Sequence, residues 1–165
     1  MAIVRSRSRH QPLRMERCHA GTTSNLCYGI AVQANRWRVC GIAVNGVLRD
    51  LKPKNFVRQS PELDRYLGCQ PNMKNFGAAA HVCGPDTATH TICIHELFCT
   101  MRDRSTGADS KLSTIIHEAT HFTDTFSSGD HKYTITPFLP RWGQQNPDLA
   151  IDNADSIAGY VVYEN

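Results

Sequence analysis

The sequence lacks several features that define common structural classes. No apolar run approaches the roughly 20 residues that a helix needs to cross a bilayer, so we expect no membrane span. No pair of cysteines has CxxC spacing, which argues against a zinc ribbon. The net charge of +3 over 165 residues is too small to indicate a nucleic-acid partner, and no repeat is visible. We therefore expect one globular domain and, by default, a monomer.

Acidic residues are absent from the first 15 positions, whereas arginine is frequent there. Five arginines occur within the first 17 residues, and Glu16 is the first acid. We expect residues 1–20 to form a basic, mobile arm and residues 21–165 to form the domain, with a docking or targeting segment as the alternative for the arm. No apolar signal-peptide core follows the arm, so the route of export is not visible in the chain.

Cysteine is abundant: seven cysteines are too many for an ordinary cytosolic domain of this size. Disulfide bonds formed in an oxidising compartment explain this number, and we therefore expect a secreted protein. Because the number is odd, at least one thiol stays free or pairs with another chain.

The spacing of apolar and turn-forming residues predicts an α+β domain that is mainly helical, with a small β-sheet. Asp109 or Ser110 can cap a helix in which Leu112, Ile116 and Ala119 recur at helical spacing. The remaining expected elements are one or two helices over 24–51, a short helix among loops over 51–77, strands within 78–84 and 90–99 around a turn, and a last helix from 147.

The segment HEATH, residues 117–121, carries the clearest chemical signal. His117 and His121 are four residues apart, so on a helix both imidazoles can bind one zinc ion, with Glu118 beside its open position. Both histidines are roughly 140 to 180° from the apolar stripe around Ile116, so they are expected to face away from the core.

A zinc site of this kind needs a third protein ligand. A histidine ten residues after His117 is excluded because Ser127 stands there, and the only later glutamate is Glu164 near the end of the chain. Asp124 is too far along the helix to reach the same ion. Asp130 is the best candidate, since Ser127, Ser128 and Gly129 can turn the chain back. The other candidates are His131, Asp148, Asp152 and Asp155.

These residues resemble the deuterolysin and peptidyl-Lys metalloendopeptidase family, the aspzincins. The family signature is HExxH, then an aspartate nine residues after the second histidine and a tyrosine three residues later. His117, Glu118, His121, Asp130 and Tyr133 occupy those positions. The likeness extends over about residues 90–165, while Thr134 and the residues just before Asp130 depart from the family pattern.

The resemblance implies a zincin-like fold and a zinc endopeptidase acting on proteins or peptides. In this interpretation His117, His121 and Asp130 bind zinc, Glu118 is the general base and Tyr133 stabilises the oxyanion. Asp155 matches an acid that binds a substrate lysine, although it can equally cap the last helix. Because Ala158 stands where a further glutamate is expected, strict lysine specificity is not expected.

The segment 90–99 contains four further potential ligands: His90, Cys93, His95 and Cys99. Strand alternation would place the last three on one side, so a second small metal site is one interpretation. The resemblance instead makes Cys93 a disulfide cysteine. For the whole chain two functions are open: a secreted zinc endopeptidase, with small size and a basic arm that suit a bacterial or fungal toxin or effector, and a non-catalytic binding domain stabilised by zinc.

Overall fold

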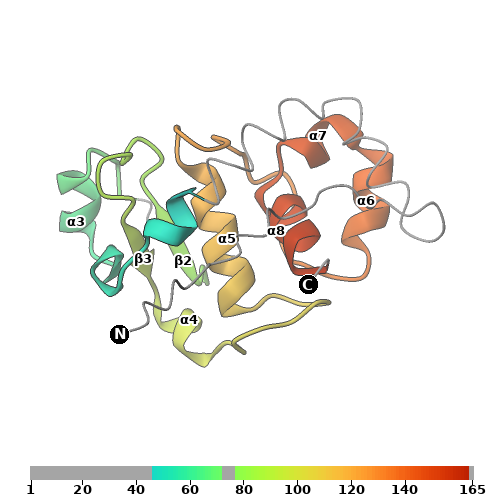
Figure 1. The fold of residues 1–165 in the computed structure, drawn as a ribbon, viewed down its shortest axis with the longest axis horizontal. Coiled ribbons are helices and arrows are strands. Elements are labelled where there is room, and N and C mark those ends of the chain that lie inside the picture. Colours follow the sequence, from blue (N-terminus) through green and yellow to red (C-terminus); the bar gives the residue numbers. More distant parts are fainter. Residues whose placement is uncertain (1–45, 72–76, 164–165) are drawn as a thin grey trace, which may run out of the picture.

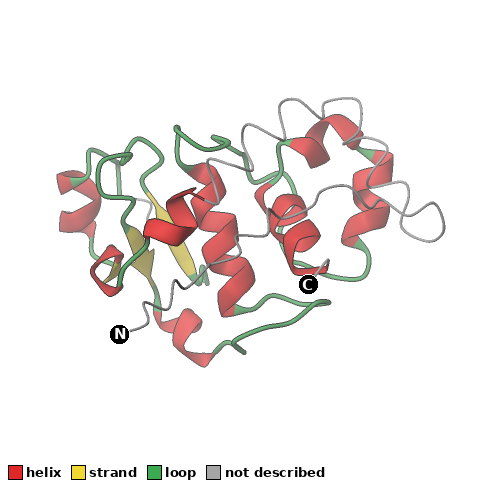
Figure 2. Ribbon diagram, in the orientation of Figure 1, coloured by secondary structure: helices red, strands yellow, loops and turns green. Residues whose placement is uncertain are grey.

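The computed structural model describes residues 46–71 and 77–163. After a helical segment at 46–50, the elements follow in this order: η1 (Pro53–Asn55), β1 (Phe56–Arg58), α3 (Pro61–Tyr66), β2 (Ala80–Val82), β3 (Ile92–Ile94), α4 (Glu96–Thr100), α5 (Lys111–His121), α6 (Leu139–Gln145), α7 (Pro147–Ile151) and α8 (Ala154–Tyr163). Helices predominate and the strands are short (Figure 2). None of the helices within these two ranges is long and apolar enough to span a membrane.

The three strands form one small mixed sheet in the order β1-β3-β2. The central strand β3 pairs in parallel with β1 and antiparallel with β2. Its residues Ile92 and Cys93 are fully buried, as expected for a strand with neighbours on both edges. In the antiparallel pair His81 lies opposite Cys93, so these two side chains share one face of the sheet.

Helix α5 runs through the middle of the molecule, with the sheet and α3 on one side and α6, α7 and α8 on the other (Figure 1). Two apolar clusters hold this arrangement together. Ala119 and Phe122 pack towards the sheet against Ala80 and Ile92. Ile116 packs in a second cluster, which consists otherwise of Ile135, Leu139, Ala158 and Val162. The apolar residues of α5 thus serve two cores, and the helix is covered on more than one side.

The fold class inferred from the sequence is confirmed: the domain is α+β, with helices around a small sheet. The strand expected within 78–84 and the short helix within 51–77 are present, whereas the single helix expected from 147 is divided into α7 and α8. Strand β1 was not anticipated, because Pro53 and Pro61 on either side of it indicate loops. The basic arm and most of the helices expected over 24–51 lie outside the described residues.

Candidate metal centre

Helix α5 begins where the sequence indicates. Ser110 is the N-cap, and its hydroxyl accepts a hydrogen bond from the Ser113 amide at 3.2 Å. Asp109, the alternative cap, instead accepts a hydrogen bond at 2.7 Å from the amide of Ile135, beyond the end of α5. The start of the helix is thereby fixed and sets the direction in which the HEATH segment presents its side chains.

The structure brings His117, His121 and Asp130 together. The Nε2 atoms of the two histidines lie 3.1 Å apart. Asp130 Oδ1 lies 3.3 Å from Nε2 of His117 and 3.4 Å from Nε2 of His121. One ligand atom from each residue therefore converges on a common point, as a single metal ion requires.

The other nitrogen of each imidazole determines what these Nε2 atoms can do. Nδ1 of His117 lies 2.8 Å from a carboxylate oxygen of Asp155, and Nδ1 of His121 lies 2.8 Å from the carbonyl oxygen of Ser128. Both partners are acceptors, so each Nδ1 carries the proton and donates it. In neutral histidines both Nε2 atoms are then lone-pair donors to a metal, facing each other and a carboxylate. This donor set fits a divalent cation, and zinc in particular.

The same acidic partners make both imidazoles more basic, so a metal that binds at the Nε2 atoms must displace a proton from them. Burial opposes protonation of His117, but its hydrogen bonds with Asp130 and Asp155 outweigh burial and raise its pKa to about 10. The pKa of His121 is raised by Asp130 in the same way, against the effect of burial. Although burial acts in the opposite direction, the two histidines hold the pKa of Asp130 well below its ordinary value. The three groups together favour a positive charge between them.

The loop that carries Asp130 is held by the junction of α7 and α8. Ser127 adopts a left-handed φ of 52°, which turns the chain back towards α5 as expected. The Gly129 amide donates to the carbonyl oxygen of Asp152 at 2.8 Å, and the Ala154 amide donates to the carbonyl of Gly129 at 3.0 Å. Asp130 is thus placed by backbone pairing with a segment more than 20 residues further along the chain.

Asn153 completes this attachment, and the sequence analysis did not single it out. The side chain is fully buried, and its Oδ1 accepts hydrogen bonds from the amides of His131 and Lys132 at 2.9 and 2.7 Å. Its Nδ2 donates to the Lys132 carbonyl and to Ser156 Oγ, each at 3.0 Å. An asparagine just before a helix is a signal for a cap, but nothing in the sequence indicates that it binds a loop over 20 residues earlier.

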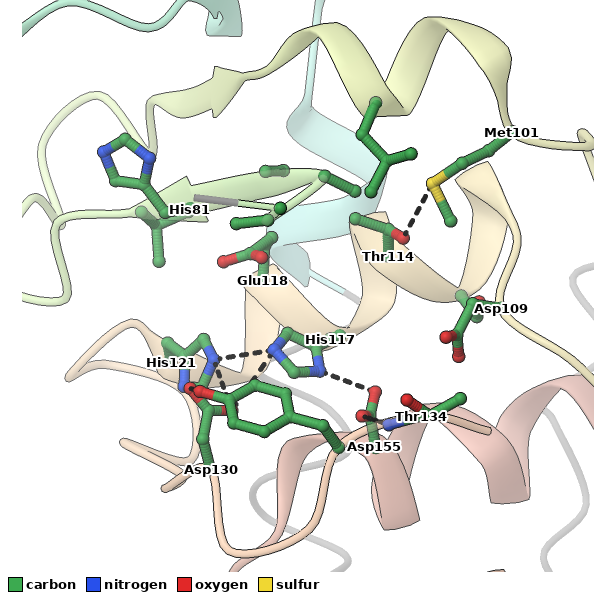
Figure 3. A pocket seen from close by; sticks show the side chains of 18 of the residues that line it. His81, Met101, Asp109, Thr114, His117, Glu118, His121, Asp130, Thr134 and Asp155 are labelled. Atoms are coloured by element: carbon green, nitrogen blue, oxygen red, sulfur yellow. Dashed lines mark hydrogen bonds and ion pairs between the residues drawn. The ribbon is translucent and has the colours of Figure 1, made fainter. Parts of the chain in front are cut away.

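A cleft of about 780 Å³ opens beside the three converging groups. Glu118 lies within it, between His81 and the histidines of α5 (Figure 3). Only 5% of Glu118 is exposed, and burial raises its pKa, although His117 and His121 partly oppose this rise. The prediction that the HEATH histidines face away from the core needs correction in one respect: they point into the cleft, but His117 is only 8% exposed because α8 covers that face.

Tyr133 lies at the edge of the cleft and is 63% exposed. Its hydroxyl donates a hydrogen bond to Asp130 Oδ2 at 2.9 Å, which leaves Asp130 Oδ1 towards the histidines. Burial and the negative charge of Asp130 raise the pKa of Tyr133 to about 12. The phenol therefore remains a neutral hydrogen-bond donor throughout the physiological pH range.

Asp155 lies behind His117, inside the first turn of α8 and not at its cap position. Its carboxylate is largely buried, and both oxygens are engaged: Oδ1 with Nδ1 of His117, and Oδ2 with the amide of Thr134 at 2.6 Å. The helix-cap interpretation is therefore wrong. Asp155 borders the cleft, so its predicted contact with substrate stays a prediction.

The remaining candidates for the third ligand point elsewhere. His131 lies 3.1 Å from a carboxylate oxygen of Asp152, so these two residues pair with each other. Asp124 follows the end of α5 and pairs with His90 at 3.0 Å. Asp148 is exposed on α7. Among these candidates only Asp130 approaches both histidines of α5.

Two expectations for residues 90–99 are wrong. Strand β3 ends at Ile94, His95 caps α4 and Cys99 lies on α4, so alternation does not gather Cys93, His95 and Cys99 on one side. Cys93 is a free, buried thiol and not a disulfide cysteine. The residue opposite it on β2 is His81 and not another cysteine. The disulfide in the described residues joins Cys69 and Cys83. Cys99 is free as well and exposed.

Comparisons with known proteins agree with these observations. Residues 52–162 match the aspzincin family described as lysine-specific metallo-endopeptidase. The match begins well before residue 90, the point at which the resemblance inferred from the motifs begins. Among solved structures, a zinc peptidase from Grifola frondosa is similar at 18% identity, with a TM-score of 0.45 over 89% of this chain and 98% of that chain. No curated protein matches.

Proposed function

Because the chain belongs to the aspzincin family of metallo-endopeptidases, we propose that it is a secreted zinc endopeptidase, with His117, His121 and Asp130 as zinc ligands and Glu118 as general base. The observation that carries this proposal is the convergence of the Nε2 atoms of two histidines and one carboxylate oxygen at the edge of a cleft. When bound, zinc supplies Lewis-acid activation of water and of the peptide carbonyl. A peptide chain fits a cleft of about 780 Å³.

Glu118 moves the proton in this proposal. It follows His117 directly, so the helix places its carboxylate beside the ligand set and inside the cleft. A carboxyl group with a raised pKa is a stronger base than an ordinary glutamate. Glu118 accepts a proton from the attacking water and passes it to the leaving amine.

Tyr133 and Asp155 take supporting roles. The Tyr133 hydroxyl is exposed at the edge of the cleft and stays protonated, so it can turn from Asp130 to the oxyanion of the tetrahedral intermediate. Asp155 orients the His117 ring and fixes its tautomer, as carboxylates behind metal-binding histidines commonly do. Each oxygen of Asp155 already accepts one hydrogen bond, so a substrate lysine would have to bind at the remaining lone pairs.

The specificity of cleavage is proposed to be broader than lysine alone. Ala158, at the position where the resemblance calls for a glutamate, is fully buried in the apolar cluster with Ile116 and Ile135. The position of Ala158 therefore supplies no negative charge to bind a substrate amine. Sequencing the products of a peptide mixture tests the point: cuts confined to bonds before lysine would contradict it.

Secretion is supported by the Cys69–Cys83 disulfide, because such bonds persist in oxidising compartments. The toxin or effector role suggested by the small size and basic arm remains part of the proposal. The alternative, a non-catalytic domain stabilised by zinc, is less favoured, since a structural zinc site closes its fourth position and needs neither Glu118 nor Tyr133.

The decisive experiment combines metal analysis with a casein-cleavage assay. We expect bound zinc and cleavage in the wild type, while Glu118→Gln keeps the zinc and loses roughly 10²- to 10⁴-fold in kcat/KM. Glu96→Gln is the matched control, because Glu96 is exposed on α4 and pairs only with Arg58 among the described residues. Bound zinc without cleavage in the wild type would support the binding domain, and a Glu118→Gln protein as active as the Glu96→Gln control would refute the role of Glu118.

A further inference from the structure

We propose that Asp64, His81 and Cys93 form a second divalent-metal site, on the sheet side of Glu118. One carboxylate oxygen, one imidazole nitrogen and one sulfur of these residues lie within 4.8 Å of one another, the same convergence that His117, His121 and Asp130 show. The inference stands on this second cluster and does not depend on the proposed endopeptidase activity.

The three groups are brought together by the sheet and the helix beside it. His81 on β2 and Cys93 on β3 are direct cross-strand partners, so their side chains project from the same face. Asp64 on α3 covers that face, and its Oδ1 lies 2.7 Å from Nε2 of His81. Three separate segments thus contribute one group each, and the strand pairing fixes two of them relative to each other.

Two of the three groups are buried. Asp64 is 3% exposed and Cys93 is fully buried, and Asp64 and His81 both border the cleft. Within the described residues the Asp64 carboxylate pairs with His81, and no hydrogen bond holds the Cys93 thiol. The Asp64 carboxylate and the adjacent Cys93 sulfur can therefore both bind a cation. Once the thiol loses its proton, the two groups supply two anionic ligands.

The ligand chemistry selects the class of metal. Sulfur, imidazole nitrogen and carboxylate oxygen together suit zinc or a similar first-row ion, whereas magnesium and calcium prefer oxygen alone. Burial and the nearby charge of Asp64 raise the pKa of the Cys93 thiol to about 12, so metal binding must displace its proton. This sulfur ligand distinguishes the second site from the first, which contains none.

His95 supports His81 as Asp155 supports His117. Nε2 of His95 lies 2.7 Å from Nδ1 of His81. When a metal takes the Nε2 lone pair of His81, the ring proton resides on Nδ1 and is donated to His95. Burial, together with His81, lowers the pKa of His95, which keeps it neutral and able to accept that proton.

Cobalt(II) titration of the metal-free full-length protein tests the proposal, because only thiolate coordination gives an intense sulfur-to-cobalt absorption in the near ultraviolet. We expect two bound equivalents and this absorption in the wild type. Cys93→Ser and Asp64→Asn should each lose one equivalent and the absorption, whereas Cys99→Ser, which removes the exposed thiol, should keep both. His117→Ala should lose the other equivalent and keep the absorption, so the two sites are scored separately.

A single bound equivalent without the absorption in the wild type would overturn the second site. Absorption that survives in both Cys93→Ser and Asp64→Asn would also overturn it, since the sulfur would then come from another cysteine. The Asp64→Asn protein guards against a folding defect in the core variant, because asparagine keeps the shape and one hydrogen bond to His81.

Discussion

The carboxylate of Asp155 lies 2.8 Å from Nδ1 of His117 and joins α8 to the helix that carries both histidines. The same carboxylate accepts a hydrogen bond from the amide of Thr134, in the loop that follows Asp130. The buried Asp155 side chain therefore orients His117, a proposed zinc ligand, and also holds the loop that carries Asp130, another proposed ligand.

Asp155→Asn should weaken zinc binding by about 10- to 100-fold, because the amide can satisfy His117 or Thr134 but not both. The expected kinetic signature is a lower kcat with little change in KM, measured at a fixed zinc concentration, with affinity determined by competition against a chelator. Asp148→Asn on exposed α7 serves as the control. A change in KM confined to lysine-containing substrates would instead assign Asp155 to the substrate.

Asn153→Ala should release the loop that presents Asp130. The substitution removes the partners of two amides, one carbonyl and one hydroxyl in a fully buried position. We expect a loss of about 2 to 4 kcal/mol in the free energy of unfolding, measured by urea denaturation, together with weaker zinc binding. Asn146→Ala, whose side chain donates to the Trp142 carbonyl and to no other group in the described part of the chain, should cost about 1 kcal/mol. Equal losses in the two variants would argue against the role of Asn153 in holding the loop of Asp130.

Thr134→Gly should stabilise the protein. Thr134 is exposed and adopts a φ of 80°, a region that β-branched residues rarely enter and that glycine enters freely. Glycine relieves strain worth about 1 to 3 kcal/mol, which exceeds its entropy cost. We therefore expect the free energy of unfolding, measured by thermal denaturation, to rise by roughly 1 kcal/mol. Thr136→Gly, at a position without positive φ, should be destabilising. A loss of stability in both variants would contradict the assignment of strain.

Tyr133→Phe should lower kcat by roughly 10²-fold and leave KM nearly unchanged, because an oxyanion donor acts in the transition state. Tyr66→Phe, on an exposed tyrosine of α3, is the matched control and should behave as the wild type. If Tyr133 serves only to hold Asp130, the substitution will change zinc affinity and leave kcat of the zinc-saturated protein intact.

Asp86 should make stability depend on acidity. Burial alone would raise its pKa, but hydrogen bonds from Thr89 and Thr91 hold it below its ordinary value. A lowered folded-state pKa contributes stability above the unfolded-state value, about 4, and this stability is lost as the pH falls through the folded-state value. Urea denaturation from pH 7 to pH 3 should show the loss in the wild type. Asp86→Asn should be less stable at pH 7 and should show a smaller loss over this range; parallel curves would refute the assignment.

The sequence predicts the parts of the candidate centre that lie close together in the chain. The spacing of His117 and His121 is a property of any α-helix, and Ser110 is a residue type that caps helices. Asp130 comes directly after a turn that reverses the chain, and Ser127 and Gly129 are residue types suited to such a turn. Local geometry thus predicts the histidine pair and makes Asp130 the best of several candidates, while the resemblance to the aspzincins selects Asp130 among them.

Contacts between residues far apart in the chain were not predicted from the sequence. The partner of His117 is 38 positions away in Asp155, and no periodicity connects the two. The pairing of Cys93 depends on strand register, which placed it opposite His81 and away from Cys83. Register, crossover and helix packing are set by the whole core, so a single sequence read by spacing cannot supply them.

The backbone pairing of Gly129 with Asn153 also sets an order in time. Residues 152–155 are translated 31 to 34 positions after His121, which at about 5 to 20 residues per second is roughly 2 to 7 s later. His117 and His121 are thus synthesised seconds before the α7–α8 junction exists to hold Asp130 beside them. Biosynthesis itself keeps the proposed zinc centre incomplete until the second half of the domain has been made.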